Sequence, residues 1–361
     1  MATPRLVSVV GGTGAQGIPI IKALVSSGLY TVRALTRDPT NGRFKDLQSH
    51  GPVEAVIGTF ASESDLHTLF RGAWGAFVNI DGFNSGEKSE IFWTIRAWEI
   101  AIEEGVQLFV LGNLDYAYKK SGFRPQFHAG HYDGKGRVAD FILAQNKDTE
   151  FRGLVKMRSA VFTSGPYIEM TLGKNTPFAP VVEGDTAVWR VPLGEGAVPF
   201  VALDDCGFYV KYLFDHPDEA DGLNLAVAID HVTFTEYTRA FTAVTGHPAR
   251  WDDTELHQHV ENIFGPRVDL PAGYNADPTD PATMTLRRNF TAFFENFRHS
   301  GGNKGIVTRD YEFLDRIHPG RIRSVEEWLR KEEDKGLGDV WSRTKELGHV
   351  LKGLEDGGGK I

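Results

Sequence analysis

The fold of this chain is decided by the stretch LVSVVGGTGAQG, residues 6–17. Its first five residues are rich in valine and leucine, which predicts a buried strand of a parallel sheet. Apolar residues then recur at helical spacing, at Ile18, Ile21 and Val25, and Gly28 closes the pattern. A strand, a tight glycine turn and a helix whose free N–H groups face that turn together form a site for an anion.

The three glycines of the turn, spaced three residues apart, have separate expected roles. Gly11 permits the turn, Gly14 lets the backbone approach a pyrophosphate, and Gly17 lets the helix pack closely against the strand. Because the pattern stands between a predicted strand and a predicted helix, it is a specific signal. We therefore expect the chain to bind a dinucleotide, in preference to the alternative of a glycine-rich turn without a ligand.

The composition indicates a soluble, cytoplasmic protein. A chain of 361 residues with 41% hydrophobic residues can bury a full core, as one large domain or two modest ones. The net charge of −9 argues against direct contact with duplex nucleic acid. Cys206 is the only cysteine, so no internal disulfide forms and a reducing compartment fits. We find neither a signal segment nor an apolar run long enough to cross a membrane.

The first half of the chain alternates between strand and helix patterns. This alternation predicts an α/β fold, a Rossmann-type doubly wound parallel sheet, in a dinucleotide-binding domain of residues 1–165. The strands expected after the first are residues 31–36, 53–58, 76–80 and 106–111.

The second half, residues 166–361, is expected to form a smaller α+β lobe, interleaved with the first domain, with a C-terminal helical extension. Short strands are predicted at 187–191 and 223–227, and a long loop at 266–281. Asp205 is expected to cap the helix that follows it. Two apolar stripes at helical spacing follow: one contains Phe290, Phe293, Phe294 and Phe297, and the other Val340, Leu347, Val350, Leu351 and Leu354; residues 357–360 should fray.

Arg37 stands at the end of the second strand, where the adenosine ribose lies in such folds. An acidic residue there suits the 2′-hydroxyl of NAD, whereas an arginine suits the 2′-phosphate of NADP. Asp38 is adjacent, but its side chain should point elsewhere. The sequence therefore favours NADP as the cofactor.

Three motifs together resemble the NmrA-like family of atypical short-chain dehydrogenases/reductases, which includes an NADPH-sensor branch. They are GGTGAQG at residues 11–17, TRDP at 36–39 and HYDGKG at 131–136. The sequence around Asp310-Tyr311 and SVEEW at 324–328 is similar to the C-terminal region of that branch. The resemblance covers most of residues 5–330 and implies a Rossmann domain with a smaller lobe, between which a substrate or an effector binds.

The resemblance also implies cofactor-binding residues. Lys135 matches the lysine that holds the nicotinamide ribose, and Asn79 follows the fourth strand beside the ribose and diphosphate. Thr59 stands where the family often has an aspartate after a glycine, and residues 163–166 look inserted before the segment of Tyr167. The full set implied is Gly11, Thr13, Gly14, Ala15, Gln16, Arg37, Thr59, Phe60, Asn79, Lys135 and Tyr167.

The catalytic groups of short-chain dehydrogenases are only partly present. A tyrosine normally acts as the acid, four residues before the lysine, and a serine holds the carbonyl. Here the pair is His131 and Lys135, and Gly112 takes the serine's place. A neutral histidine, its pKa depressed by the lysine charge, is one candidate proton donor. The alternatives are that His131 only starts a helix, or that one of Tyr116, Tyr118 and Tyr132 is the donor.

A metal site is not expected. His128, His131 and Asp133 have the side chains of metal ligands, but the glycine-rich context and the neighbouring lysine argue against that use. Cys206 follows two aspartates, whose charge should raise its thiol pKa and lower its reactivity.

Two functions remain open from the sequence. The first is an NADP(H)-dependent oxidoreductase that acts on a small, aromatic or polyketide-like molecule within an apolar pocket. The second is a non-catalytic NADP(H) sensor, in which binding reorders loops around Arg37 and residues 82–87 and changes a surface that a partner protein contacts.

Overall fold

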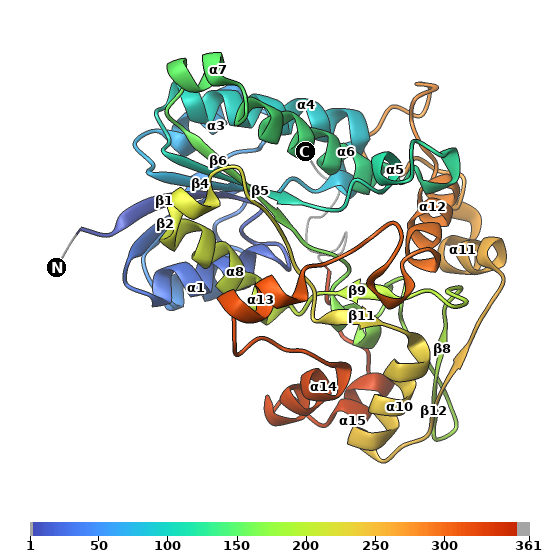
Figure 1. Ribbon diagram of the computed structural model, residues 1–361. Helices are drawn as coiled ribbons and strands as arrows, with labels where there is room; N and C mark the ends of the chain where they lie inside the picture. The colour runs from blue at the N-terminus through green and yellow to red at the C-terminus, as the bar shows by residue number, and fades with distance from the viewer. Residues whose placement is uncertain (1–2, 352–361) are drawn as a thin grey trace.

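A seven-stranded parallel sheet is the centre of the computed structural model, which describes residues 3–351 (Figure 1). The strand order is β10-β6-β5-β4-β1-β2-β3, so the chain moves outward from β1 in one direction and then returns to extend the other side. The strands are β1 (Arg5–Val10), β2 (Tyr30–Thr36), β3 (Val53–Ile57), β4 (Gly75–Val78), β5 (Leu108–Asn113), β6 (Arg158–Thr163) and β10 (Asn224–Ala226). The predicted doubly wound Rossmann-type sheet is confirmed, and its order reverses between β1 and β4.

Helices cover both faces of this sheet (Figure 1). One layer contains α3 (Glu63–Phe70), α4 (Gly82–Glu103), α6 (Gly130–Gln145) and α7 (Thr149–Leu154). The other contains α1 (Gly17–Ser26), α2 (Gly42–Ser49), α8 (Leu203–Asp215), α9 (Pro217–Ala220) and α13 (Tyr311–Ile317).

The central strands are apolar throughout because both faces are covered. In β5, Leu108 and Val110 join the core on the α1 side, whereas Phe109 and Leu111 join the core on the α4 side. This arrangement is the physical reason for continuous rather than alternating hydrophobic runs in the sequence.

The smaller lobe contains two short sheets and a helical layer. Its strands are β7 (Val181–Glu183), β8 (Thr186–Arg190), β9 (Val198–Phe200), β11 (Asp230–Val232) and β12 (Ala249–Asp252). Its helices are α10 (Phe234–Thr245), α11 (Leu256–Phe264), α12 (Leu286–Arg298), α14 (Val325–Asp334) and α15 (Val340–Lys345), and the short α5 (Ala117–Lys120) lies beside α6. The four phenylalanines of the predicted stripe lie on α12 and are buried in the lobe core.

The strand predicted at residues 223–227 does not belong to this lobe. It is β10, which pairs with β6 at the edge of the main sheet. Helix α8 also joins the first domain, because Gly207 has no side chain and lets α8 approach α1 closely: a Cβ there would lie 2.6 Å from the carbonyl oxygen of Pro19. A boundary at residue 165 therefore does not separate the two cores, since segments on both sides of it build the sheet domain.

Three local expectations are wrong. Residues 82–87 are not a loop but the start of α4, which is kinked at Gly86, where φ is 74°. Asp205 does not cap α8; Ala202 takes that position, and the Asp205 carboxylate accepts a hydrogen bond from the backbone N–H of Ile322. The predicted apolar stripe that begins at Val340 does not lie along one helix, because α15 ends at Lys345, before Leu347.

Between the end of α15 and residue 351 the chain forms no helix. The carbonyl oxygen of Gly348 accepts a hydrogen bond of 2.9 Å from the N–H of Lys174, so this backbone pairs with another segment instead of with itself. Leu354 and residues 357–360 lie outside the described residues.

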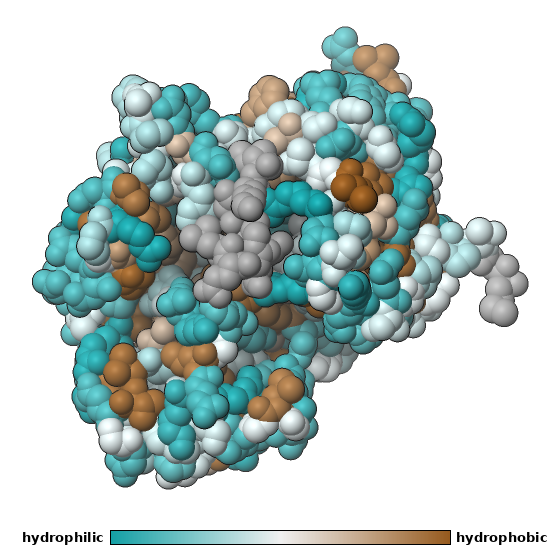
Figure 2. Space-filling model, turned by 180° about the vertical axis from the view of Figure 1, so that it is seen from behind, coloured by the Kyte–Doolittle hydropathy of each residue, from teal (hydrophilic) through white to brown (hydrophobic). Residues whose placement is uncertain are grey.

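The face seen in Figure 2 is largely hydrophilic, with apolar residues gathered in small separate groups. Among residues 3–351 no helix is both long and apolar enough to cross a bilayer.

Candidate cofactor and active site

The glycine turn has the close contacts that its sequence predicts. Gly11 has φ of 85°, and a Cβ on it would lie 2.5 Å from the carbonyl oxygen of Asn79. A Cβ on Gly17 would lie 2.2 Å from the carbonyl oxygen of Gly11, so α1 can start here only without a side chain. A Cβ on Gly14 would have one near neighbour, the same oxygen at 3.2 Å, which leaves its outer side open.

Within residues 3–351 the backbone N–H groups of Ala15, Gln16 and Gly17 have no partner, whereas that of Ile18 already donates to the carbonyl oxygen of Gly14 at 3.2 Å. Gln16 is the residue before the helix, and its side chain makes no capping hydrogen bond. Uncapped N–H groups at a helix N-terminus, beside a backbone without side chains, are suited to a phosphate. The residues of this turn, including Thr13 and Ala15, therefore fit the pyrophosphate of a dinucleotide.

The Gln16 side chain instead belongs to a chain of hydrogen bonds along the carboxyl edge of the sheet. Lys135 Nζ donates to Asn79 Oδ1 at 2.9 Å, and Asn79 Nδ2 donates to Gln16 Oε1 at 2.7 Å. Gln16 Nε2 then donates to Ser164 Oγ at 3.1 Å, and that hydroxyl faces the carbonyl oxygen of Asn113. This hydrogen-bonded chain of side chains links α6, the end of β4, the glycine turn, the end of β6 and β5. Ser164 lies in the stretch that looks inserted from the sequence.

Arg37 and its neighbours lie at the end of β2. Arg37 is exposed and follows the strand directly, while Asp38 is turned to Thr40, from which its Oδ1 accepts a backbone hydrogen bond of 2.8 Å. Arg43, on α2, donates to the carbonyl oxygen of Thr13 at 3.4 Å. Arg43 is therefore a second cation beside the glycine turn, which the sequence analysis did not single out. Its signal was an arginine six residues after Arg37.

An aspartate on α3 contacts the stretch that follows β3. Thr59 replaces the aspartate of the family pattern, but its N–H donates to Asp65 Oδ2 on α3 at 2.9 Å. The carboxylate also occupies the space beside Gly58, where a Cβ would lie 2.5 Å from the same oxygen. Phe60 is half-buried against the core on the α4 side. A carboxylate thus lies beside Thr59, although it belongs to a residue six positions farther along the chain.

Lys135 has a buried carboxylate partner that the sequence analysis missed. Its Nζ donates to the carbonyl oxygen of Ile80 at 2.6 Å and lies 2.6 Å from Glu90 Oε1. The Glu90 side chain is only 1% exposed, and burial raises its pKa to about 7 even though the Lys135 charge lowers it. Glu90 lies within α4, and no local pattern distinguishes it from an ordinary helix residue.

Gly112 excludes the usual serine for a steric reason. A Cβ on Gly112 would lie 2.7 Å from the Cβ of Asn79 and 2.9 Å from its Cγ. Asn79 is fixed between Lys135 and Gln16, so it cannot move aside without breaking the hydrogen-bonded chain. The Asn79 side chain can therefore occupy its position only because residue 112 is a glycine.

His131 lies one helical turn before Lys135 and is 8% exposed. Its ring packs among aromatic rings, at 4.7 Å from Phe83 and 5.7 Å from Phe290 between centroids. Its Nδ1 lies 3.0 Å from Asn289 Oδ1 on α12. Burial, with a smaller contribution from the Lys135 charge, lowers the pKa of His131 to about 4, so the imidazole is neutral near pH 7. The expected lysine effect is present, but burial is the larger cause.

The three candidate tyrosines have other neighbours. Tyr132 is 2% exposed within the lobe core, and burial raises the pKa of its hydroxyl. Tyr116 packs against Gly136, and Tyr118 stacks on His128 at 4.7 Å between ring centroids. Of the four candidates, His131 has the position four residues before the lysine that the usual tyrosine has.

Tyr167 leads from β6 into the lobe and precedes the short 3₁₀ helix Ile168–Leu172. Burial raises the pKa of its hydroxyl, as it does for the nearby Cys206 thiol, whose pKa the Glu169 and Asp205 charges raise further. Burial also raises the pKa of Glu169 to about 8. The thiol pKa of Cys206 is therefore raised, as expected, with burial as the main cause.

A second buried ion pair joins the lobe to the sheet. Arg309 donates to both carboxylate oxygens of Asp115, at 3.1 and 2.8 Å, and to the carbonyl oxygens of Ser164 and Val227. Lys120 adds a further contact of 2.7 Å to Asp115. These charges hold the pKa of Asp115 at about 2 despite its burial. The pair reaches the hydrogen-bonded chain through Ser164.

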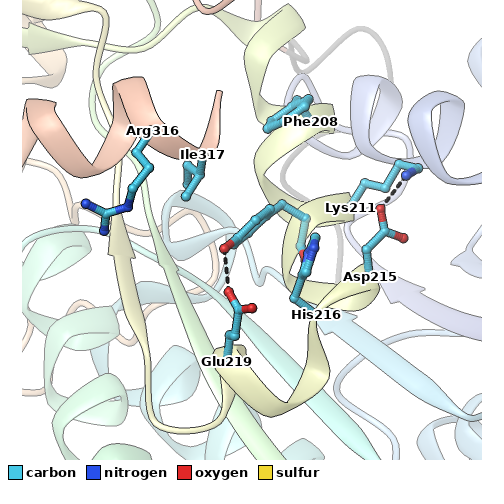
Figure 3. Close-up of a pocket in the computed structure, with 8 residues that line it drawn as sticks. Phe208, Lys211, Asp215, His216, Glu219, Arg316 and Ile317 are labelled. Carbon is cyan, nitrogen blue, oxygen red and sulfur yellow. Dashed lines mark hydrogen bonds and ion pairs between the residues drawn. The ribbon is translucent and has the colours of Figure 1, made fainter. Parts of the chain in front are cut away.

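A separate cavity of about 480 Å³ lies between α8, α9 and α13 (Figure 3). Its charged groups already pair with one another: Lys211 with Asp215, and the Tyr212 hydroxyl with Glu219 at 2.8 Å. The cavity lies at the opposite edge of the sheet, where α9 contacts the start of β6.

Within residues 3–351, no group of three or more His, Cys, Asp or Glu side chains is arranged to hold a metal ion.

The model of the NmrA-like family matches residues 3–293. The chain belongs to the NmrA-like family. One curated relative, the NmrA-like family domain-containing oxidoreductase hkm9 of Aspergillus hancockii, is 28% identical over 284 residues, which are 74% of this chain and 81% of the relative.

Solved structures of the NmrA-like kind share the fold. A crystal structure of NmrA, described as a negative transcriptional regulator in complex with NADP, superposes with a TM-score of 0.69 at 17% identity, over 94% of this chain and all of that chain. An NADPH-dependent quinone oxidoreductase from Escherichia coli, QOR2, superposes with a TM-score of 0.62 at 14% identity, over 90% and 99%. At these identities the likeness supports the Rossmann-type fold alone.

Proposed function

We propose that this NmrA-like protein is an NADP(H)-dependent oxidoreductase that acts on a small, aromatic or polyketide-like molecule. The observation that carries the proposal is the hydrogen-bonded chain from Lys135 through Asn79 and Gln16 to Ser164. This chain fixes the lysine relative to the glycine turn, so one rigid edge can position both ends of a dinucleotide.

Each residue has a distinct role in this proposal. The N–H groups after Gly14 hold the pyrophosphate, while Arg37 and Arg43 face the 2′-phosphate end and favour NADP over NAD. Lys135 orients the nicotinamide ribose. The bound cofactor would supply or accept a hydride, and the aromatic rings around His131 would exclude water and hold a flat substrate.

The names of the relatives support the reaction class. The matched curated relatives are described as oxidoreductases, and QOR2 is described as acting on quinones. The net charge of the chain makes a nucleic-acid partner a poor alternative, and a small molecule is the partner that the aromatic wall suits.

The test has a binding arm and a turnover arm. We expect NADPH to bind more tightly than NADH, and Arg37→Ala to reduce that preference by roughly ten- to hundredfold, because a charge-assisted contact is lost. Arg330→Ala, which removes an exposed arginine of α14, is the matched control. A panel of quinones, enones, imines and aromatic carbonyls should then oxidise NADPH. Tight NADPH binding without turnover of any panel member would contradict the oxidoreductase function.

The alternative is a non-catalytic NADP(H) sensor that acts through a protein partner. It is favoured by Gly112 and His131 in place of the usual serine and tyrosine, and by the description of NmrA as a transcriptional regulator. The sensor predicts that NADP⁺ and NADPH change which proteins the full chain captures or its oligomeric state. Identical behaviour with and without cofactor would contradict it.

A further inference from the structure

The hydrogen bonds of Asn289 determine which nitrogen of His131 carries the proton. Asn289 Oδ1 accepts from the backbone N–H of His131 at 3.4 Å and lies 3.0 Å from Nδ1 of the same residue. A backbone N–H can only donate, so the amide atom facing it is the oxygen. That oxygen can only accept, so Nδ1 carries the ring proton.

The other ring nitrogen therefore has a free lone pair. In a neutral imidazole with a proton on Nδ1, Nε2 accepts hydrogen bonds and cannot donate one. Among residues 3–351, Nε2 has no hydrogen-bond partner. The charged groups that act on the ring are Lys135 on the same helix and Glu87 on α4; burial outweighs both and keeps the ring neutral.

The surroundings of His131 define what can reach this lone pair. Phe83, Phe290 and Phe293 place their rings 4.7 to 5.7 Å from the imidazole between centroids. Apolar walls around one acceptor select a flat apolar body with a single polar donor, because an unpaired polar group is costly in such a place.

We propose that His131 Nε2 is a hydrogen-bond acceptor that orients an aromatic substrate carrying an O–H or N–H group, and that Asn289 is the positioning residue that fixes this orientation. The inference rests on the proposed function, since it assigns the substrate contact of the same site. It replaces the expectation that His131 donates a proton.

The tautomer is tested directly. In the full chain bound to NADP⁺ and labelled with ¹⁵N-histidine, the His131 signal, assigned with His131→Gln, should be that of a ring protonated on Nδ1 from pH 5.5 to 8. A ring protonated on Nε2, or an imidazolium within that range, overturns the proposal. Asn289→Ala should mix the two tautomers.

The acceptor role is tested with a matched ligand pair, 2-naphthol and 2-methoxynaphthalene, on the NADP⁺-bound protein. We expect naphthol to bind about tenfold more tightly, as befits one buried hydrogen bond. His131→Phe should abolish this preference, and Asn289→Ala should reduce it. Asn296→Ala is the control, because Asn296 is equally buried on α12 and does not contact His131.

The outcomes separate this inference from the proposed function. Equal affinity for the two ligands, no binding of naphthol, or an unchanged preference in His131→Phe overturns the acceptor role. An unchanged preference in Asn289→Ala overturns the positioning role, and this variant stays informative if His131→Phe does not fold. NADPH binding and panel turnover, measured on the same preparations, test the proposed function independently.

Discussion

Two buried ion pairs lie along the same sheet edge but have opposite electrostatic characters. Asp115 and Arg309 are 2% and 0% exposed, and the carboxylate receives two hydrogen bonds from the guanidinium. Glu90 is equally buried beside Lys135, yet neither of its oxygens has a well-formed hydrogen bond within residues 3–351. The pKa of Asp115 falls to about 2, whereas that of Glu90 rises to about 7.

The difference teaches that burial alone does not decide how an ion pair behaves. A buried charge is stable only when its hydrogen-bonding capacity is filled, and the planar fork of an arginine fills that of a carboxylate. The Asp115–Arg309 pair therefore fastens the lobe to the sheet. The Glu90–Lys135 pair leaves unused capacity beside the expected nicotinamide site, which suits a place where a ligand arrives.

The largest effect is expected from breaking the fastened pair. Arg309→Met leaves Asp115 charged and buried, which should lower the free energy of unfolding by about 3–5 kcal/mol. Urea denaturation of the full chain measures this. Arg323→Met, which removes an exposed arginine paired with Asp315, should cost no more than about 1 kcal/mol. Similar losses in the two variants would contradict the comparison.

The next effect is a pH dependence of opposite sign in the two pairs. The Glu90 pKa is raised in the folded state, so its contribution to stability is complete below pH 4.5 and is lost as pH rises through about 7. Glu90→Gln should therefore gain stability relative to the wild type over that range, by up to about 3 kcal/mol. Denaturation at a series of pH values measures the difference.

The Asp115 pair supplies the reverse case. Because its folded pKa is lowered, the stability it contributes is present above pH 3.8 and is lost as pH falls through about 2. Asp115→Asn should accordingly approach the wild type in stability only in strong acid. If both variants followed pH in the same direction, the contrast between the pairs would be refuted.

The two ion pairs should also differ in their effect on cofactor binding. Lys135→Met should weaken NADPH binding by roughly ten- to hundredfold, through loss of a charge-assisted contact. Its folding should be nearly unaffected, since the Glu90 partner can take a proton. Isothermal titration measures the affinity. Lys119→Met, which removes an exposed lysine paired with Asp140, is the matched control and should bind NADPH normally.

The smallest effect tests the outer contact of Asp115. Lys120 is 41% exposed and shares the carboxylate with Arg309. Lys120→Met should therefore cost at most about 1 kcal/mol of unfolding free energy, because an exposed cation gains little from its partner. If Lys120→Met lowered the unfolding free energy as much as Arg309→Met does, Arg309 would not be the main partner that stabilises the Asp115 carboxylate.

Local sequence was sufficient to predict those elements and site residues whose defining interactions are short in range. The strand, glycine turn and helix of residues 6–26 follow from apolar periodicity and from contacts within a few residues, and the structure has them as predicted. The Rossmann-type sheet follows because alternating elements of that length have few arrangements. Arg37 and Lys135 could be named because each stands at a fixed offset from a recognisable motif.

Only the tertiary structure decided the contacts between distant segments. Glu90, Asn289 and Arg309 lie 45, 158 and 194 residues from their partners Lys135, His131 and Asp115, and nothing near them in the sequence marks them. The same holds for β10, whose short apolar run fits an edge strand of either sheet until β6 provides its hydrogen bonds. Periodicity reports which face of an element is buried, whereas the identity of the neighbour depends on how the whole chain packs.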